Sequence, residues 1–133
     1  MKGHAAHNEA ACDLLHAAGK FPDWVITTAF YAAMHYVYEE LFPLKEGTTT
    51  YASFENYYSQ KFARRAVGDK PNKHDATVDL VREHLPAVAS HYRLLKDQCF
   101  NARYRNYAVK GHEAAMARNQ LQSIKTWLTA KKK

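Results

Sequence analysis

Apolar residues recur at helical spacing along most of the chain, and this pattern predicts a protein built from helices. Residues 4–18 form the first such segment, and Gly19 is expected to end it, because a glycine readily adopts the left-handed conformation that closes a helix. The apolar stripe of this segment comprises Ala6, Ala10, Leu14, Ala17 and Ala18. No stretch alternates apolar and polar residues between turn signals, so no sheet is expected.

A second helix is expected from Trp24 to about Phe42, between an N-cap at Asp23 and the helix breaker Pro43. It is apolar nearly all round. One side carries Val25, Ala29, Ala33, Val37 and Leu41, and another carries Trp24, Tyr31, Tyr38 and Phe42. A helix that is apolar on more than one face has to be buried on more than one face. In so small a domain, a central position together with a subunit contact meets this requirement, and the pattern therefore favours a dimer.

Loop and breaker signals divide the rest of the chain. Residues 44–50 are predicted as a loop, followed by a helix over residues 51–67 that Gly68 closes. After a loop at 68–73, a long helical segment runs from His74 to about Tyr104, and Pro86 should break it near the first turn of its second piece. The second piece has an inner stripe of Val88, Tyr92, Leu95 and Cys99.

A last amphipathic helix is expected from about Gly111 to Ala130. Its apolar residues are Ala115, Leu121, Ile124, Trp127 and Leu128. The expected fold is therefore all-α, an antiparallel bundle of four to five helices. It forms a single domain over residues 1–130, with a disordered lysine tail at 131–133.

Composition and charge fit this picture. The chain has 133 residues, 47% of them hydrophobic, which is enough for one packed core. The formal charge is 19 − 13 = +6, and half of it lies in the three terminal lysines, which leaves about +3 for the folded body. That excess is compatible with a polyanionic partner. No signal peptide and no run of 18 apolar residues is present, so we expect a cytoplasmic protein with no membrane partner.

Metal and thiol chemistry find little support. Cys12 and Cys99 are far apart in helix-forming segments, and two buried thiols are favoured over a disulfide, which the sequence leaves open. Glu-x-x-His and His-Glu-x-x-His are both absent. His4 and His7 share a helical face but have no third ligand nearby in sequence. We therefore expect no metal site and no cofactor.

The segment 102–115, ARYRNYAVKGHEAA, concentrates the candidate chemistry. Six residues separate Arg105 from His112, which places them about 10 Å apart along an unbroken helix. If the chain turns and a new helix begins at Gly111, the two side chains can approach. His112 then lies in a first turn, where the helix dipole favours the neutral imidazole. The alternative is that these are ordinary solvated residues at two helix ends.

An arginine and a neutral histidine are sufficient for metal-free cleavage of RNA. The ribose 2′-hydroxyl attacks the adjacent phosphate, His112 transfers a proton, and Arg105 stabilises charge on the phosphoryl oxygens. Asn106 is positioned in sequence to orient either group. DNA is excluded as a substrate, because it has no 2′-hydroxyl.

The segment WVITTAFYAAMHYVYEEL resembles the second helix of HEPN domains, in which an aromatic pair and small residues precede a histidine, here His35. The approach to this helix, Gly19-Lys-Phe-Pro-Asp-Trp24, and the tripeptide at 102–104 are also similar to small prokaryotic HEPN proteins. The resemblance covers almost the whole chain in the right order. It implies a helical bundle that commonly dimerises. In many members it also implies a metal-independent endoribonuclease of toxin–antitoxin, phage-defence or CRISPR systems.

The resemblance also implies roles for residues. The family motif is an arginine, a polar residue and a histidine after a spacer, and Arg105, Asn106 and His112 match it. Two copies of the motif meet across a two-fold axis in the family. Arg103 is implied as a supporting contact and competes for the role of the motif arginine. Tyr31 and Tyr104 are candidates for base stacking, and His35 is a second site candidate for which a buried structural role is favoured.

Three interpretations follow. The first is a homodimeric ribonuclease or toxin that cleaves single-stranded RNA and is paired with a nucleotidyltransferase or an antitoxin. The second is a non-catalytic module that binds RNA, nucleotides or a protein partner. The third is a structural or assembly protein whose aromatic faces bury against other subunits.

Overall fold

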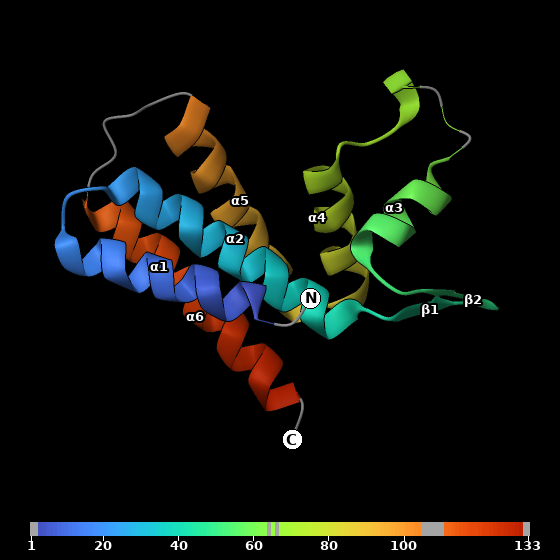
Figure 1. Ribbon diagram of the computed structural model, residues 1–133, viewed down its shortest axis with the longest axis horizontal. Coiled ribbons are helices and arrows are strands. Elements are labelled where there is room, and N and C mark those ends of the chain that lie inside the picture. The colour runs from blue at the N-terminus through green and yellow to red at the C-terminus, as the bar shows by residue number, and fades with distance from the viewer. Residues whose placement is uncertain (1–2, 64, 66, 105–110, 132–133) are drawn as a thin grey trace.

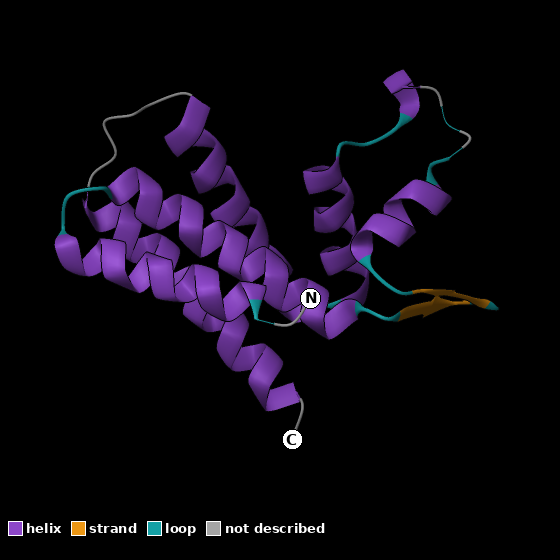
Figure 2. Cartoon of the chain, viewed as in Figure 1, coloured by secondary structure: helices purple, strands orange, loops and turns teal. Residues whose placement is uncertain are grey.

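The computed structural model describes residues 3–63, 65, 67–104 and 111–131, and these residues are mostly helical (Figures 1 and 2). The α-helices are α1 (His4–Ala18), α2 (Pro22–Leu41), α3 (Phe54–Lys61), α4 (Lys73–His84), α5 (Ala89–Tyr104) and α6 (Gly111–Lys131). Two strands, β1 (Leu44–Glu46) and β2 (Thr49–Tyr51), and two 3₁₀ helices, Val67–Asp69 and Pro86–Val88, complete the described ranges. No helix within these ranges has both the length and the apolar composition of a membrane span.

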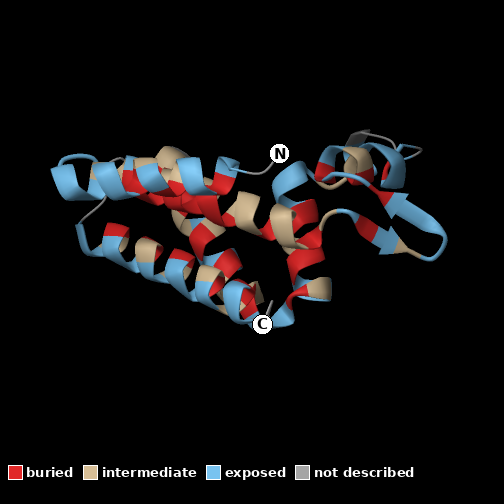
Figure 3. Ribbon diagram, turned by 60° about the horizontal axis from the view of Figure 1, so that its bottom comes forward, coloured by how far each residue is buried: buried red, intermediate tan, exposed pale blue. Residues whose placement is uncertain are grey.

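Helix α2 lies at the centre of the bundle and packs against α1, α5 and α6 (Figure 1). Its buried side includes all five residues of the first predicted stripe, Val25, Ala29, Ala33, Val37 and Leu41, and Ile26, Thr27, Phe30 and Ala32 are buried as well. Figure 3 shows the buried residues of these helices turned toward one another and the exposed residues turned outward. The prediction of a mostly helical fold is therefore confirmed, but the described residues form six α-helices instead of four to five, together with two short strands. Because packing within one chain already covers several sides of α2, the apolar pattern no longer requires a second subunit, and dimerisation stays a prediction.

Several predicted boundaries were wrong. Helix α2 begins at Pro22, two residues earlier than expected, so Asp23 lies inside the helix rather than at the N-cap. The helix predicted over residues 51–67 is confined to α3, which begins after the N-cap Ser53, whose side chain accepts a hydrogen bond from the Asn56 N–H at 3.1 Å. The break at Pro86 and the helix start at Gly111 are confirmed.

The loop predicted at residues 44–50 is a β-hairpin. β1 and β2 pair antiparallel with Leu44 opposite Tyr51, and both of these side chains are buried. Gly47 makes the reversal possible, because its φ of 61° lies in the left-handed region that favours glycine. Three-residue strands are too short to show the alternation by which a strand is recognised in a sequence.

The buried face of α1 also differs from the predicted stripe. Ala6, Ala10, Ala17 and Ala18 are exposed, and Leu14 is 73% exposed. The buried residues of α1 are Ala5, Glu9 and Cys12. In α6, similarly, Ala114 and Ala117 are buried, whereas Ala115 is exposed. Alanine is only weakly hydrophobic, so an alanine-rich helix has no strongly apolar side. The packing of neighbouring helices, and not the alanine pattern, determines which side is buried.

Glu9 is a charged residue inside this interface, with only 9% of its surface exposed. Its carboxylate accepts hydrogen bonds from the Tyr36 hydroxyl at 2.6 Å and from Lys125 Nζ at 2.9 and 3.1 Å, and Gln122 Nε2 donates at 3.2 Å. Burial acts to raise the pKa of Glu9, but the hydrogen bonds from Lys125 and Tyr36 outweigh burial, and the pKa is lowered overall. Glu9 therefore fastens α1 to α2 and α6 in its ionised form.

We expect Glu9→Gln to lower the free energy of unfolding at pH 7 by about 1 to 3 kcal/mol, the range for hydrogen bonds to a charged group. The folded-state pKa of Glu9 lies below its ordinary value of 4.5, so this stabilisation is present above pH 4.5 and is lost as the pH falls through the folded-state value. Urea unfolding at pH 7 and near pH 3 measures both effects. Asp13→Asn is the matched control on the same helix, because Asp13 makes an exposed ion pair with Arg118 at 2.8 Å. Equal effects of the two substitutions would contradict the assignment.

The two cysteines are free thiols, and both are buried, as the sequence favoured. The Cys12 thiol donates to the Val25 carbonyl at 3.5 Å. Burial raises the pKa of Cys12 and of Cys99. Both groups are therefore protonated at neutral pH and are poor nucleophiles, which agrees with a structural role.

Candidate functional site

The structure places some of the predicted site residues and leaves others outside its described ranges. Arg105 and Asn106 lie outside the described residues. His112 is exposed in the first turn of α6, where the sequence predicted it. Arg103 is half-buried near the end of α5, and Tyr104 is the last residue of that helix.

One face of α2 lines two hollows that share His74. The face carries Tyr31, Met34, Tyr38 and Phe42, whose spacing of three and four residues aligns them along the helix. One hollow, of about 420 Å³, lies between α2, α5 and the start of α4. The other, of about 470 Å³, lies between α2, the start of α1 and the starts of α3 and α4. We call the two hollows together the α2 groove.

The hollow beside α5 is the basic end of the groove. Arg103 Nη1 donates to the Tyr31 hydroxyl at 3.4 Å, which holds the guanidinium against α2. Lys96 Nζ pairs with Asp75 at 3.1 Å. The Phe100 ring is 45% exposed and supplies an apolar surface in the same hollow. Two cations and one carboxylate line this end, which gives it a formal charge of +1 when His74 is counted as neutral.

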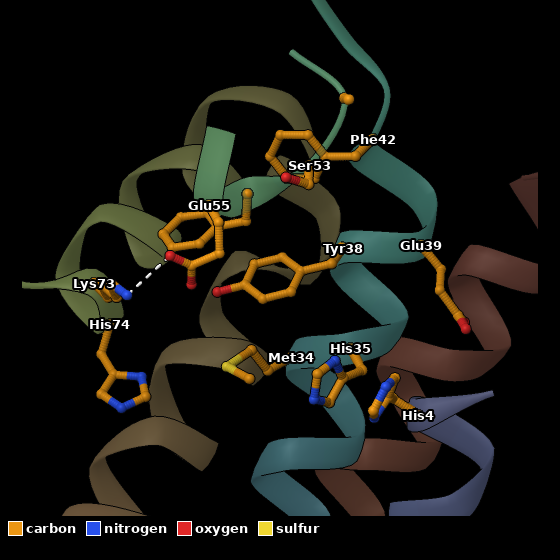
Figure 4. Close-up of a pocket in the computed structure, with 12 residues that line it drawn as sticks. His4, Met34, His35, Tyr38, Glu39, Phe42, Ser53, Glu55, Lys73 and His74 are labelled. Atoms are coloured by element: carbon orange, nitrogen blue, oxygen red, sulfur yellow. Dashed lines mark hydrogen bonds and ion pairs between the residues drawn. The ribbon is translucent and has the colours of Figure 1, made fainter. Parts of the chain in front are cut away.

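The hollow beside α3 is the aromatic end of the groove. Tyr38 stacks on Phe54 with ring centroids 4.8 Å apart. Figure 4 shows Tyr38 in the middle, with Lys73 and His74 on one side of it and His35 and Glu39 on the other. Three further contacts define the rim: Lys73 Nζ to Glu55 at 2.9 Å, the His4–His35 ring stack at 5.1 Å, and the bond from the Gly3 N–H to Glu39 at 3.1 Å. With Lys73 against Glu39 and Glu55, the formal charge of this end is −1 when its histidines are counted as neutral.

Two groove histidines are biased toward the neutral form. Burial lowers the pKa of His35, and the neighbouring His4 lowers it further. Although His74 as a whole is exposed, the surrounding protein partly desolvates its ring and lowers its pKa, with a further contribution from Lys96. Burial raises the pKa of Tyr38 to about 12, so its hydroxyl, bonded to Thr77 Oγ1 at 2.7 Å, stays protonated. At neutral pH these groups offer hydrogen bonds without adding charge.

The structure shows what lies beside one apolar side of α2. Tyr31, Tyr38 and Phe42 line a groove within one chain, and the predicted subunit contact stays a prediction. His35 was expected to be buried and hydrogen-bonded, but it is half-buried and stacks on His4. The half-wet character of tyrosines at helical spacing was the available signal for a groove. Lys73, His74 and Lys96 carried no comparable signal, because they are distant from α2 in the sequence.

Of the predicted nuclease residues that the structure describes, Arg103 lines the α2 groove, and His112 lines neither of its two hollows. Gly111, the residue before His112, lines a third hollow of about 170 Å³ at the α1–α2 turn. That hollow is bordered by Leu15, Phe21 and Val25.

No family model, no curated protein and no solved structure matches this chain. The HEPN resemblance stays an expectation that rests on the residues quoted for it. Function is therefore argued from the chemistry of the groove and of the exposed residues around it.

Proposed function

We propose that this protein is a non-catalytic nucleotide- or RNA-binding module and that one nucleotide unit occupies the α2 groove. The observation that carries this proposal is the division of the groove into a basic end and an aromatic end. A nucleotide has the same division, because an anionic phosphate is joined through a sugar to a flat base. Membership of the HEPN family and pairing with a nucleotidyltransferase or an antitoxin are parts of the same proposal.

The basic end suits the phosphate. Arg103 presents a planar guanidinium that can make two parallel hydrogen bonds to phosphate oxygens, and Lys96 lines the same hollow. The Tyr31 hydroxyl receives the Arg103 bond at 3.4 Å and so limits the positions that the guanidinium adopts. A partly fixed arginine loses less conformational entropy when it binds a ligand than a freely rotating one does.

The aromatic end suits the base and ribose. Tyr38 and Met34 form its apolar floor, and His35 and His74 stand at its edges. Neutral imidazoles can donate to or accept from the edge of a base, whereas the rings offer a stacking surface to any base. Six residues separate Tyr31 from Tyr38, which places them about 10 Å apart along α2. Each hollow falls within the roughly 300–1,000 Å³ typical of small-molecule sites.

We expect Arg103→Gln to weaken binding of adenosine monophosphate and of a short single-stranded RNA by about 10- to 100-fold, as the loss of a charge-assisted hydrogen bond implies. Isothermal titration at two salt concentrations measures the affinity and its ionic part. Arg118→Gln is the matched control, because it removes the same charge from α6 outside the groove. If the wild type binds neither probe, or if both variants bind as it does, the proposal is wrong.

A second candidate is the metal-independent endoribonuclease of toxin or phage-defence type. The observation that favours it is the exposed position of His112 in the first turn of α6, open to RNA and to another copy of the chain. In this candidate His112 of one copy and Arg105, Asn106 and Arg103 of another make a composite site. It differs from the binding module in predicting cleavage of single-stranded RNA in the presence of EDTA.

A further inference from the structure

Three side chains with metal-ligating groups meet where the β-hairpin passes the end of α4. Glu46 is the last residue of β1, and Glu83 and His84 are the last two residues of α4. One donor atom from each lies within 4.8 Å of the other two. These residues do not line the α2 groove, so the cluster is independent of the proposed nucleotide site.

The His84 imidazole has an unsatisfied nitrogen in this cluster. Its Nε2 atom is buried and has no hydrogen-bond partner among the described residues. The nearest carboxylate oxygens are Glu46 Oε2 at 3.8 Å and Glu83 Oε1 at 3.9 Å, which is too far for a hydrogen bond. A buried polar atom without a partner is destabilising, so a group that bridges the three donors would relieve an existing penalty.

We propose that Glu46, Glu83 and His84 bind a divalent transition-metal ion of the Zn²⁺ class. Zinc binds imidazole nitrogen and carboxylate oxygen at about 2.0–2.2 Å, so two donors on one ion are separated by up to about 4 Å. The two separations from Nε2 are within that limit, and the third, between the two carboxylates, is at most 4.8 Å. One imidazole and two carboxylates favour such an ion over Mg²⁺ or Ca²⁺, which prefer oxygen ligands alone.

Lys61 supports this arrangement of donors. Its Nζ atom pairs with Glu46 Oε1 at 2.9 Å and leaves Oε2 directed at His84. Hydrogen bonds of this kind to a ligating carboxylate orient it for a metal. Two carboxylates and one ammonium give the cluster a formal charge of −1 with His84 neutral, which is attractive to a dication. The ion would fasten the projecting hairpin to the end of α4 (Figure 1).

Untagged protein, treated with EDTA and then dialysed, can be titrated with Zn²⁺ by calorimetry, with Tm recorded in parallel. We expect one ion per chain and a rise in Tm in the wild type. His84→Gln and Glu83→Gln should each weaken Zn²⁺ binding at least about tenfold, since even the loss of an indirect contact to a metal weakens binding by about that much. His7→Gln is the matched control, because it disrupts the alternative pair of His4 and His7 on α1 and should leave binding intact.

Three results would overturn the inference: no Zn²⁺ binding by the wild type, loss of binding in His7→Gln instead of His84→Gln, or equal binding of Mg²⁺. The Tm of each metal-free variant shows whether it folds. If His84→Gln fails to fold, Glu83→Gln carries the test, because the Glu83 side chain is 65% exposed and its loss leaves the core intact. Nucleotide binding should be unaffected by Glu83→Gln, which separates this test from that of the α2 groove.

Discussion

Leu95→Ala should lower the free energy of unfolding by about 2 to 5 kcal/mol, whereas Leu94→Ala should change it by less than about 0.5 kcal/mol. The two leucines are neighbours on α5 with the same chemistry and nearly the same backbone position. Leu95 is 0% exposed, and Leu94 is 52% exposed. The difference between the variants therefore measures burial alone.

The expected loss at position 95 has two sources. Removal of the side chain forfeits its transfer from water into the core, and it leaves a cavity that the surrounding helices fill only in part. Leu95 belongs to the same buried cluster as Tyr92 and Cys99 of α5 and Leu121 and Ile124 of α6. A cavity there weakens the contact between α5 and α6, the two helices that contain the ends of the 102–115 segment.

Urea denaturation of both variants beside the wild type measures this difference. Unchanged m-values would show that the substitutions alter stability and not the extent of unfolding. Equal effects at positions 94 and 95, or a larger effect at 94, would mean that α5 presents a different face to the core. The placement of Arg103 and Lys96 in the α2 groove would then also be wrong, because both lie on the same helix.

If the second candidate function holds, His112→Ala should abolish cleavage of single-stranded RNA in EDTA, with a loss of at least about 100-fold in rate. General acid–base transfer from a positioned imidazole contributes about this factor or more, and alanine has no proton to transfer. The wild type should leave cyclic phosphate ends, since the ribose 2′-hydroxyl is the attacking group.

The exposed position of His112 makes this substitution a clean test of chemistry. Tm should be unchanged, because no core contact is removed. His7→Ala is the matched control, since His7 is an exposed histidine near the start of α1. Cleavage by His112→Ala at the wild-type rate would remove the catalytic assignment, and absence of cleavage by the wild type would leave only the binding module. Sedimentation of the wild type would show whether the dimer that the composite site requires exists.

The outline of the fold followed from the sequence because its signals are local. Gly19 closes α1 with a φ of 69°, Pro86 separates α4 from α5, and α6 begins at Gly111. Each of these helix boundaries depends on the backbone preferences of one or two residues. The inner stripe predicted for the segment after Pro86 was also correct, since Val88, Tyr92, Leu95 and Cys99 are all buried. When large apolar residues are spaced among charged residues along a helix, only one side of that helix can pack against the core.

Where a helix lacks a clear difference between an apolar and a charged side, the tertiary structure determined which side is buried. The alanine-rich α1 buries Glu9 and exposes Leu14, because Tyr36 and Lys125 of other helices supply the partners that a buried carboxylate needs. The α2 face that carries Tyr31, Tyr38 and Phe42 lines a groove, because the start of α4 lies beside it. The cluster of Glu46, Glu83 and His84 joins a hairpin to a helix end. Local sequence fixes backbone conformation within a few residues, but the pairing of distant side chains depends on how the helices pack, which no local pattern encodes.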